Sequence, residues 1–359
     1  MIGKKRKVRR FGWLFLLGLA LLVIVGCSSS GSGGSSSPAN TPQENGTEEQ
    51  PSANGEVITL QLGHSSIPDL PFDIGAKAFK EEVEKASEGR IIIEIYDSGQ
   101  LGTERDMIEQ VQYGTLDLYS ASAAPLINFV PEIGVIDMPF IFTSYDEVWT
   151  ALDGEVGAML AEKIEEAGFK LLGFWDEGFK NITNSQKEIR TVEDLKGLKI
   201  RTQENQVMVD TYKALGADPT PMPWGEIYTA IQQGVIDGYE GSYTPIVDGK
   251  LYEVQKYLTE ARVNYAGAVH LMNKDKFESL DPDLQQIIVQ AAEHAAQIQR
   301  KASEEQMDEF KQVVIDNGLE IIEFEELDLA PFREMVQPIY EQYGPQYSEL
   351  IEKIEALRQ

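Results

Sequence analysis

Predicted strands and helices alternate along the chain, and this alternation restricts the fold more than any other feature. Residues 56–63 (EVITLQLG) and 90–96 (RIIIEIY) read as strands, and residues 72–87 between them read as a helix rich in Ala, Glu and Lys. A helix over 103–114 and a strand over 116–122 continue the series. Because a β-α-β-α-β order is typical of crossover connections, we expect a mainly parallel sheet with helices on its faces.

A comparable α/β unit begins near Phe179. Its first strand is 197–201 (GLKIR), helices are expected over 204–215 and 221–234, and residues 235–241 (VIDGYEG) are the next strand. The residues after position 56 number about 300, enough for a large core and two lobes. No convincing short internal repeat is present beyond these two similar halves.

A long stretch without internal Pro or Gly runs from Pro282 to about Asn317, and its apolar residues recur at helical spacing. We predict a single helix there. A helix of roughly 30 residues is about 45 Å long, which is enough to run across two lobes.

The first 27 residues have the layout of an export signal. A basic head precedes a mostly apolar run from Phe11 to Val25, which is too short for a good bilayer span. The run leads into IVGC, an ending that resembles the lipobox of bacterial lipoproteins. There the cysteine, here Cys27, is lipidated and becomes the new N-terminus. A non-cleaved anchor helix with an incidental cysteine is the alternative.

Residues 28–56 are dominated by Ser, Gly, Pro, Asn, Gln, Thr and Glu. Such a segment buries too little apolar surface to offset its chain entropy, so we expect a flexible tether. Its root-mean-square reach would be roughly 30 Å. The resulting picture is a lipid-anchored folded domain on a flexible segment.

Composition excludes several functions. Cys27 is the only cysteine, so the folded part has no internal disulfide, no cysteine zinc site and no cysteine nucleophile. Without the six basic residues of the head, 25 Lys and Arg stand against 59 Asp and Glu, a formal charge of −34. A nucleic-acid partner is therefore not expected. A small anionic ligand requires local cations placed in a cleft.

The motifs of common enzyme and metal sites are missing. The three histidines lack paired-ligand spacing, and no GxSxG or GxxxxGK sequence occurs. We therefore expect no catalytic residues, no metal and no cofactor. Carboxylates are so plentiful that counting them does not exclude a two-acid glycosidase.

Arg201 lies where the strand 197–201 passes into a predicted helix. In open α/β sheets, ligands bind beyond the carboxyl ends of strands and next to helix N-termini. Leu198 and Ile200 would face the core, which leaves Lys199 and Arg201 on the opposite side. Because arginine can donate two parallel hydrogen bonds to a carboxylate, Arg201 is a candidate ligand contact. A surface salt bridge is the alternative.

The sequence around Arg201 resembles the signature core of the solute-binding proteins of TRAP transporters, the DctP family. The resemblance is carried by residues 178–241, which contain GLKIR, PMPWGEIYTAIQQG and DGYEG, and by residues 95–122 and 134–142 upstream. It extends from about Val57 to the end of the last helical region.

The resemblance implies a two-lobed α/β fold of the periplasmic-binding-protein type, a Venus flytrap with crossing strands and a long lobe-spanning helix. The implied division of the chain is signal peptide and lipobox over 1–27, tether over 28–56, lobe one over 57–178 with about 267–306, and lobe two over 179–266 with about 307–359.

The family holds the carboxylate of its ligand through the arginine that corresponds to Arg201. A second cation, commonly arginine, is Lys180 here, which keeps the charge but loses the bidentate fork. Trp224 stands where a phenylalanine usually packs on the ligand, although a core tryptophan is the alternative.

The resemblance also departs from the family at Gly241, where many members have an asparagine that hydrogen-bonds the ligand. Either Ser242 or Tyr243 supplies that contact, or additional ligand volume fills the space. Glu240 either accepts hydrogen bonds from the ligand or braces Arg201.

Three further polar residues are expected at the cleft. Ser122 and His64 lie at strand ends in the first half of the chain, although a lone histidine is more often structural. Gln203 is a candidate hydrogen-bond donor at the entrance of the following helix.

The resemblance implies a monomeric protein outside the cytoplasm, lipid-anchored to the cell membrane. It would capture an organic acid by lobe closure and deliver it to the membrane subunits of a TRAP transporter, which an ion gradient drives. C4-dicarboxylates, sugar acids, keto or hydroxy acids and aromatic acids all remain candidate ligands. A sensory lipoprotein and a secreted enzyme acting on carboxylated sugars are the alternatives.

Overall fold

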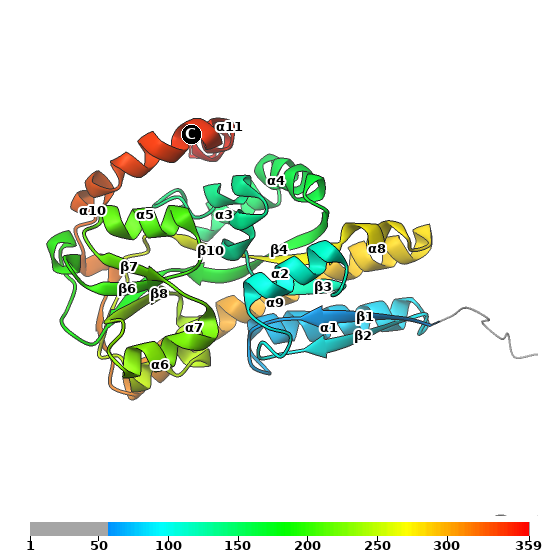
Figure 1. Ribbon diagram of the computed structural model, residues 1–359, viewed down its shortest axis with the longest axis horizontal. Coiled ribbons are helices and arrows are strands. Elements are labelled where there is room, and N and C mark those ends of the chain that lie inside the picture. The colour runs from blue at the N-terminus through cyan, green and yellow to red at the C-terminus, as the bar shows by residue number, and fades with distance from the viewer. Residues whose placement is uncertain (1–56, 359) are drawn as a thin grey trace, which may run out of the picture. The chain divides into compact units, whose positions relative to one another are not determined.

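The computed structural model describes residues 57–358, which form α/β structure with two β-sheets (Figure 1). This architecture confirms the predicted fold class. The predicted export signal, the lipidation site Cys27 and the tether lie outside the described residues. Over 57–358, no helix combines the length and the apolar character that crossing a bilayer requires.

The first sheet has five strands in the order β2-β1-β3-β10-β4. β1 pairs in parallel with β2 and β3, as predicted, whereas β10 runs antiparallel to β3 and β4. The chain leaves the first sheet along β4, forms strands of the second sheet, and returns to the first sheet along β10. β10 therefore runs in the opposite direction to its neighbours. The strands are β1 (Ile58–Gly63), β2 (Ile91–Tyr96), β3 (Leu118–Ser122), β4 (Phe169–Phe179) and β10 (Tyr265–Asn273).

The second sheet has six strands in the order β11-β9-β5-β8-β6-β7. β6 is parallel to β7 and β8, and β9 is parallel to β11, while β5 is antiparallel to β8 and β9. The strands are β5 (Asn181–Asn184), β6 (Lys199–Thr202), β7 (Asp218–Pro221), β8 (Gly238–Gly241), β9 (Tyr257–Thr259) and β11 (Glu320–Ile322).

Helices cover the faces of both sheets (Figure 1). The α-helices are α1 (Pro71–Ala86), α2 (Glu104–Tyr113), α3 (Tyr145–Leu152), α4 (Glu155–Glu166), α5 (Gln206–Ala214), α6 (Ile227–Gln232), α7 (Tyr243–Asp248), α8 (Lys274–Glu278), α9 (Pro282–Asp316), α10 (Ala330–Met335) and α11 (Gln337–Ala356). Short 3₁₀ helices span Ala124–Asn128, Pro131–Val135, Val192–Leu195, Trp224–Glu226, Leu251–Glu253 and Phe324–Glu326. The helix predicted over 221–234 is therefore a 3₁₀ turn followed by α6.

Two buried apolar clusters fix the direction of the strand that carries Arg201. The larger cluster underlies the first sheet and includes Ile200 of β6 and Val207 of α5. The smaller one packs Tyr239 of β8 against residues of α6, α7 and the C-terminal part of α9. Because Ile200 is anchored in the larger cluster, its neighbour Arg201 points away from that cluster.

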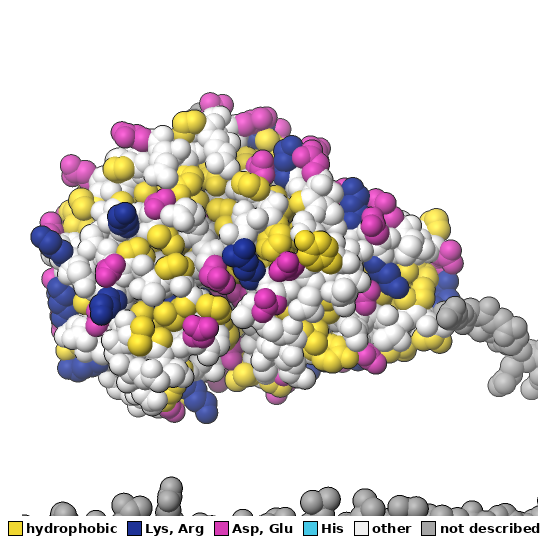
Figure 2. All heavy atoms as spheres, viewed as in Figure 1, with side chains coloured by type: hydrophobic (Ala, Val, Ile, Leu, Met, Phe, Trp, Pro, Cys, Tyr) yellow, Lys and Arg dark blue, Asp and Glu magenta, His cyan; other side chains and the backbone are white. Residues whose placement is uncertain are grey.

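Charged side chains are mixed on the surface. On the face shown in Figure 2, Lys and Arg side chains are scattered among Asp and Glu side chains. This face therefore lacks the continuous basic patch that a nucleic-acid interface requires.

The predicted long helix is confirmed as α9, which has 35 residues and contacts α1, β4 and α7. Its Gln299 is fully buried, and its side-chain amide forms hydrogen bonds with both the N–H and the carbonyl of Asp176 on β4. Asp176 N donates to Gln299 Oε1 at 2.8 Å, and Gln299 Nε2 donates to the Asp176 carbonyl at 2.7 Å. Ser303 and Tyr265 donate to the Asp176 carboxylate at 2.5 and 2.8 Å. This network joins α9 to β4.

Gln299→Ala is expected to lower the free energy of unfolding by about 2–4 kcal/mol, because it leaves a buried N–H and a buried carbonyl of Asp176 unpaired. Urea unfolding of the purified protein measures the loss. Gln297→Ala, on the exposed side of the same helix, is the control and should change stability by less than about 0.5 kcal/mol. Equal losses in the two variants would contradict the anchoring role of Gln299.

Candidate functional site

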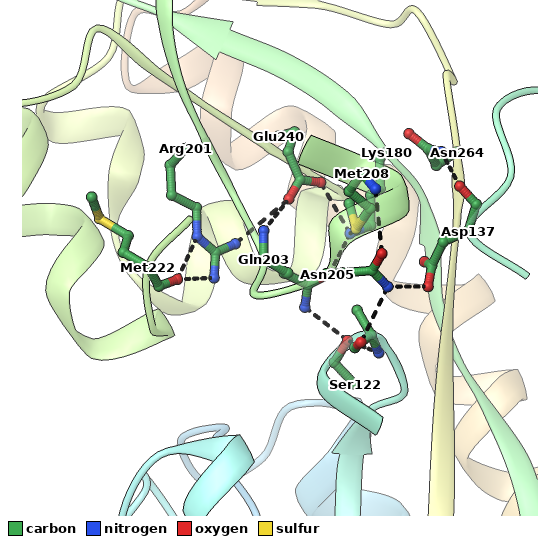
Figure 3. A network of polar contacts seen from close by, with 11 residues as sticks. Ser122, Asp137, Lys180, Arg201, Gln203, Asn205, Met208, Met222, Glu240 and Asn264 are labelled. Atoms are coloured by element: carbon green, nitrogen blue, oxygen red, sulfur yellow. Dashed lines mark hydrogen bonds and ion pairs between the residues drawn. The ribbon is translucent and has the colours of Figure 1, made fainter. Parts of the chain in front are cut away.

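Strand ends of the two sheets meet at a cluster of polar side chains (Figure 3). Gln203, just beyond β6, donates from Nε2 to Ser122 Oγ on β3 at 2.8 Å. Asn205 donates from Nδ2 to the Ala124 carbonyl at 3.1 Å and to Asp137 Oδ2 at 2.7 Å. These hydrogen bonds connect the segment after β6 directly to the end of β3 and the loop beyond it.

The segment after β6 is shaped by Asn205, the N-cap of α5. Its Oδ1 accepts from Met208 N at 3.3 Å, so the helix begins at Gln206, two residues later than predicted. The Gln203 backbone N–H donates to Glu240 Oε1 at 3.1 Å. Residues 203–205 are therefore held as a bent link, from which the side chains of Gln203 and Asn205 reach the end of β3 and the loop beyond it.

Arg201 is 3% exposed and is not a surface salt bridge. Its Nε and Nη2 donate to the Met222 carbonyl at 3.0 and 2.9 Å, and its Nη1 lies 3.7 Å from Glu240 Oε1. The guanidinium carbon lies 5.5 Å from the centre of the Tyr239 ring. These contacts fix the plane of the guanidinium. Arg201 still lines a pocket, towards which its remaining N–H groups can donate.

Lys180, which stands between β4 and β5, is 2% exposed and engaged by protein groups. Its Nζ lies 3.0 Å from Glu240 Oε2, donates to Gln203 Oε1, and lies 3.6 Å from Met208 Sδ. It is not among the residues that line the pocket beside Arg201. Glu240 thus lies between Lys180 and Arg201 and braces both cations.

The pocket beside Arg201 has a volume of about 30 Å³, which is enough to admit water. Residues from both sheets and their helices line it. They are Ser65, Ser66, Phe72, Glu104, Glu177, Arg201, Gln203, Trp224, Tyr239, Thr244, Pro245 and Asp248. Arg201 is the one cation in this lining, which it shares with three carboxyl groups.

Burial raises the pKa values of these carboxyl groups. The pKa of Glu177 rises to about 7 because the carboxyl group is desolvated, although the charge of Lys180 opposes the shift. Desolvation likewise raises the pKa of Asp248 to about 6 and shifts that of Glu104 upward. Ser65 Oγ donates to Glu104 at 2.8 Å, and Ser66 Oγ donates to Asp248 at 3.1 Å.

Trp224 separates two pockets. It lines the small pocket beside Arg201 and also an outer pocket of about 510 Å³, and Glu104 does the same. The ring is partly exposed and its centre lies 6.1 Å from that of Tyr239. Trp224 therefore lines both pockets, and it also packs against the smaller apolar cluster.

Gly241 is glycine because Tyr239 occupies the space above it. A Cβ atom at position 241 would lie 2.0 Å from Tyr239 Oη and 2.3 Å from its Cζ. Residues 239 and 241 point to the same side of β8, because side chains alternate along a strand. The tyrosine ring thus fills the volume that a side chain at position 241 would take, and it lines the pocket itself.

His64 and Tyr243, two of the predicted site residues, neither line the pocket beside Arg201 nor belong to the network of Figure 3. His64 is fully buried, with Nε2 3.6 Å from Asp73 Oδ1, and it does not line that pocket. Tyr243 donates from its hydroxyl to Glu260 Oε1 at 2.6 Å and lines a different pocket. Five predicted residues belong to the network of Figure 3, namely Ser122, Lys180, Arg201, Gln203 and Glu240. Gly241 follows Glu240 on β8, and Trp224 lines the pocket beside Arg201.

Sequence reasoning missed Glu104, Glu177, Asp248 and Tyr239, which line the pocket, and Asn205, which bridges the sheets. Tyr239 could have been predicted as a site residue, because it lies two residues before Gly241 on the same face of one strand. Asn205 could have been predicted too, as an N-cap residue before a helix. The three carboxyl groups could not, since the whole chain is acidic.

The lining determines what the pocket can do. It offers a guanidinium, carboxyl and hydroxyl groups, and the apolar faces of Phe72 and Trp224. Across residues 57–358, no group of three or more His, Cys, Asp or Glu side chains is placed to hold a metal ion. The arrangement suits the binding of a polar organic molecule that has both an acidic end and hydrogen-bond donors.

Comparison with known proteins agrees with this geometry. The family described as bacterial extracellular solute-binding protein, family 7 (DctP), matches residues 62–346. The 2,3-diketo-L-gulonate-binding periplasmic protein YiaO of Escherichia coli (strain K12) is 30% identical over 304 residues, which are 84% of this chain and 92% of the relative.

Solved structures show the same similarity. A TRAP periplasmic solute-binding protein from Polaromonas sp. JS666, bound to D-erythronate, is 35% identical with a TM-score of 0.81, covering 83% of this chain and 98% of that chain. A TRAP periplasmic solute-binding protein from Sulfitobacter sp. NAS-14.1, with bound β-D-galacturonate, is 31% identical with a TM-score of 0.79, covering 82% and 98%.

Proposed function

The chain belongs to the DctP family of bacterial extracellular solute-binding proteins, and we propose that its ligand is a sugar acid with a single carboxylate. Family members capture organic acids outside the cytoplasm and work with TRAP transporters. The observation that carries the proposal is the pocket whose lining Arg201 shares with three carboxyl groups.

Arg201 is the anchor for the ligand carboxylate. Its guanidinium is buried, and the Met222 carbonyl and Glu240 hold its orientation, so little freedom is lost when an anion binds. Its free N–H groups can donate paired, charge-assisted hydrogen bonds to a carboxylate. The Tyr239 ring lies over one side of the guanidinium, with its centre 5.5 Å from the guanidinium carbon.

A second ligand carboxylate has no partner in this arrangement. Lys180 is paired with Glu240 and does not line the pocket. Within residues 57–358, no further cation lines the pocket to pair with another anion, whereas carboxyl groups accept hydrogen bonds well from ligand hydroxyls. This combination favours a polyhydroxylated monocarboxylate over a C4-dicarboxylate. The erythronate and galacturonate bound by the similar solved proteins are acids of this type.

The pocket beside Arg201, at about 30 Å³, is too small for a sugar acid. We propose that the ligand enters when the two lobes separate, with 57–178 and about 267–306 moving against 179–266 and about 307–359. Residues 203–205 would then leave the first sheet and return on closure. The ligand stabilises the closed form by binding it better than the open form.

Membrane attachment completes the proposal. Lipidation of Cys27 would anchor the protein outside the cytoplasm, and the tether over 28–56 would let the folded part reach the transporter. The protein would release its ligand unchanged, without catalysis.

A thermal-shift screen of the purified protein against an organic-acid library tests this function. Sugar monoacids should raise the melting temperature, because a ligand well above its dissociation constant contributes a few kcal/mol, about 2.7 at a hundredfold excess. Recovery of the bound acid unchanged would support a binding protein. Stabilisation by C4-dicarboxylates alone would contradict the single-carboxylate assignment, and turnover of the bound acid would show an enzyme.

Trp224→Ala is expected to weaken sugar-acid binding by about 1–3 kcal/mol, because it removes the aromatic wall between the two pockets. Isothermal titration calorimetry measures the change. Trp149→Ala, a tryptophan that Arg300 covers on the far helix α3, is the matched control. Unchanged affinity in Trp224→Ala would remove Trp224 from the site.

A further inference from the structure

Glu177 on β4 lies between two pockets. It lines the pocket beside Arg201 and also a second pocket of about 340 Å³, and Thr244 is the other residue shared by both. Glu177 is half-buried, but its Oε2 atom is buried and has no hydrogen-bond partner within residues 57–358. A buried oxygen without a partner requires an explanation, such as a ligand or a proton that binds there.

Carboxyl groups outnumber cations around Glu177. The charged groups that surround it on the cleft side are Glu104 of α2, Asp248 of α7, Glu240 of β8, Arg201 of β6 and Lys180. The second pocket adds Glu260, Arg262, Asp308 and Lys311. The other titratable groups nearby are Tyr119, Tyr145, Tyr239, Tyr243 and Asp176.

Two of the four nearby cations are already paired with other carboxylates. Lys180 pairs with Glu240, and Lys311 lies 3.0 Å from Glu260. Asp176 is turned away and bonded by Ser303 and Tyr265. Among the residues that the structure describes, Glu177 forms no ion pair of its own. Glu104 and Asp248 form none either, but each accepts a hydrogen bond from a serine hydroxyl, whereas Glu177 Oε2 has no such partner in the described part of the chain.

We propose that Glu177 takes up one proton when an organic anion enters the cleft, and that its neutral carboxyl group then donates a hydrogen bond to the ligand. The inference rests on the proposed function. The proton passes from solvent in the second pocket to Oε2, and no covalent bond of the ligand changes. Proton uptake removes the repulsion between Glu177 and the ligand carboxylate, so the same group becomes a donor.

The direction of the pH dependence follows from this arrangement. Burial raises the pKa of Glu177 to about 7 in the ligand-free protein, and a bound anion raises it further because like charges disfavour ionisation. When the pKa of a group rises on ligand binding, the affinity is highest below the pKa of the free protein. The affinity then falls as the pH rises from that value towards the pKa of the complex. Affinity should therefore fall as the pH rises above about 7, by up to about tenfold per pH unit.

Calorimetric titration of the full-length protein at about pH 8, in two buffers of different ionisation enthalpy, measures the protons taken up. The probe is whichever of D-erythronate, D-glucuronate and D-galacturonate gives the largest thermal shift. We expect uptake approaching one proton in the wild type and almost none in Glu177→Gln. That variant should also bind about tenfold more tightly than the wild type at this pH, because glutamine mimics the neutral acid.

The control is Glu162→Gln, which makes the same charge change on the exposed side of α4 and should retain wild-type proton uptake. No uptake in the wild type, or uptake retained in Glu177→Gln, would overturn the proposal. A structural role alone would not remove the pH slope while strengthening binding.

A second measurement needs no ligand. Carbon-13 NMR of glutamate carboxyl groups should show one resonance that titrates near pH 7 and is absent in Glu177→Gln. Titration of that resonance near pH 4, the ordinary range for glutamate, would overturn the proposal even if none of the three acids bound. Failure of all three acids to bind would count against the proposed function instead.

Discussion

Arg201→Ala is expected to weaken binding of the organic acid by about 2–5 kcal/mol, the range for truncating one partner of a buried, hydrogen-bonded charge pair. Each 1.4 kcal/mol corresponds to about tenfold in the dissociation constant. The loss has two sources. The ligand carboxylate loses its charge-assisted hydrogen bonds, and it remains buried beside Glu104, Glu177 and Asp248 without a compensating cation.

Arg201→Lys should recover part of this loss, because lysine keeps the charge but cannot donate two parallel hydrogen bonds. Calorimetric titration of both variants with one sugar acid measures the series. Arg190→Ala, an exposed arginine before β6 that pairs with Glu188 and Glu326, is the matched control and should bind like the wild type. Near-wild-type affinity in Arg201→Ala would exclude Arg201 as the carboxylate ligand.

Lys180→Met is expected to lower the free energy of unfolding by about 3–5 kcal/mol, because it leaves Glu240 buried without its nearest cation. Lys180 Nζ and Glu240 Oε2 are 3.0 Å apart and both side chains are almost fully buried. The double variant Lys180→Met/Glu240→Gln should recover much of that stability, since it removes both charges together. Denaturant unfolding of the two single variants and the double variant measures the coupling.

The same variants separate a structural Lys180 from a ligand-binding one. If Lys180 braces Glu240, the double variant should regain stability, and the loss of affinity in Lys180→Met should stay smaller than in Arg201→Ala. A loss of affinity as large as that of Arg201→Ala, with stability unchanged, would instead assign Lys180 to the ligand. That result would reopen a second carboxylate contact.

Much of the fold could be predicted from the sequence, because it depends on local patterns. The alternation of strands and helices predicted the α/β class, and the stretch after Pro282 predicted α9 nearly to its last residue. The antiparallel course of β10 could not be predicted, since it depends on where the chain returns after the second sheet. The start of α5 was displaced because Asn205 caps the helix there.

The site was only partly predictable. Arg201 and Gln203 follow from their place at a strand end, and the structure places both beside Glu240. His64 and Tyr243 were predicted beside them, yet His64 is buried 3.6 Å from Asp73 and Tyr243 donates to Glu260, and neither lines the pocket beside Arg201. Which way such a side chain turns depends on partners that are distant in sequence. For the same reason, the three pocket carboxyl groups could not be distinguished from the many exposed ones.

A crystal structure of the protein with a bound sugar acid tests the central claim most directly. We expect the ligand carboxylate on the Nη1 and Nη2 groups of Arg201 at about 2.7–2.9 Å, the usual length of a charge-assisted hydrogen bond, with ligand hydroxyls directed at Glu104, Glu177 or Asp248. A carboxylate bound to Lys180, or a ligand held outside the pocket lined by Arg201, would contradict the account.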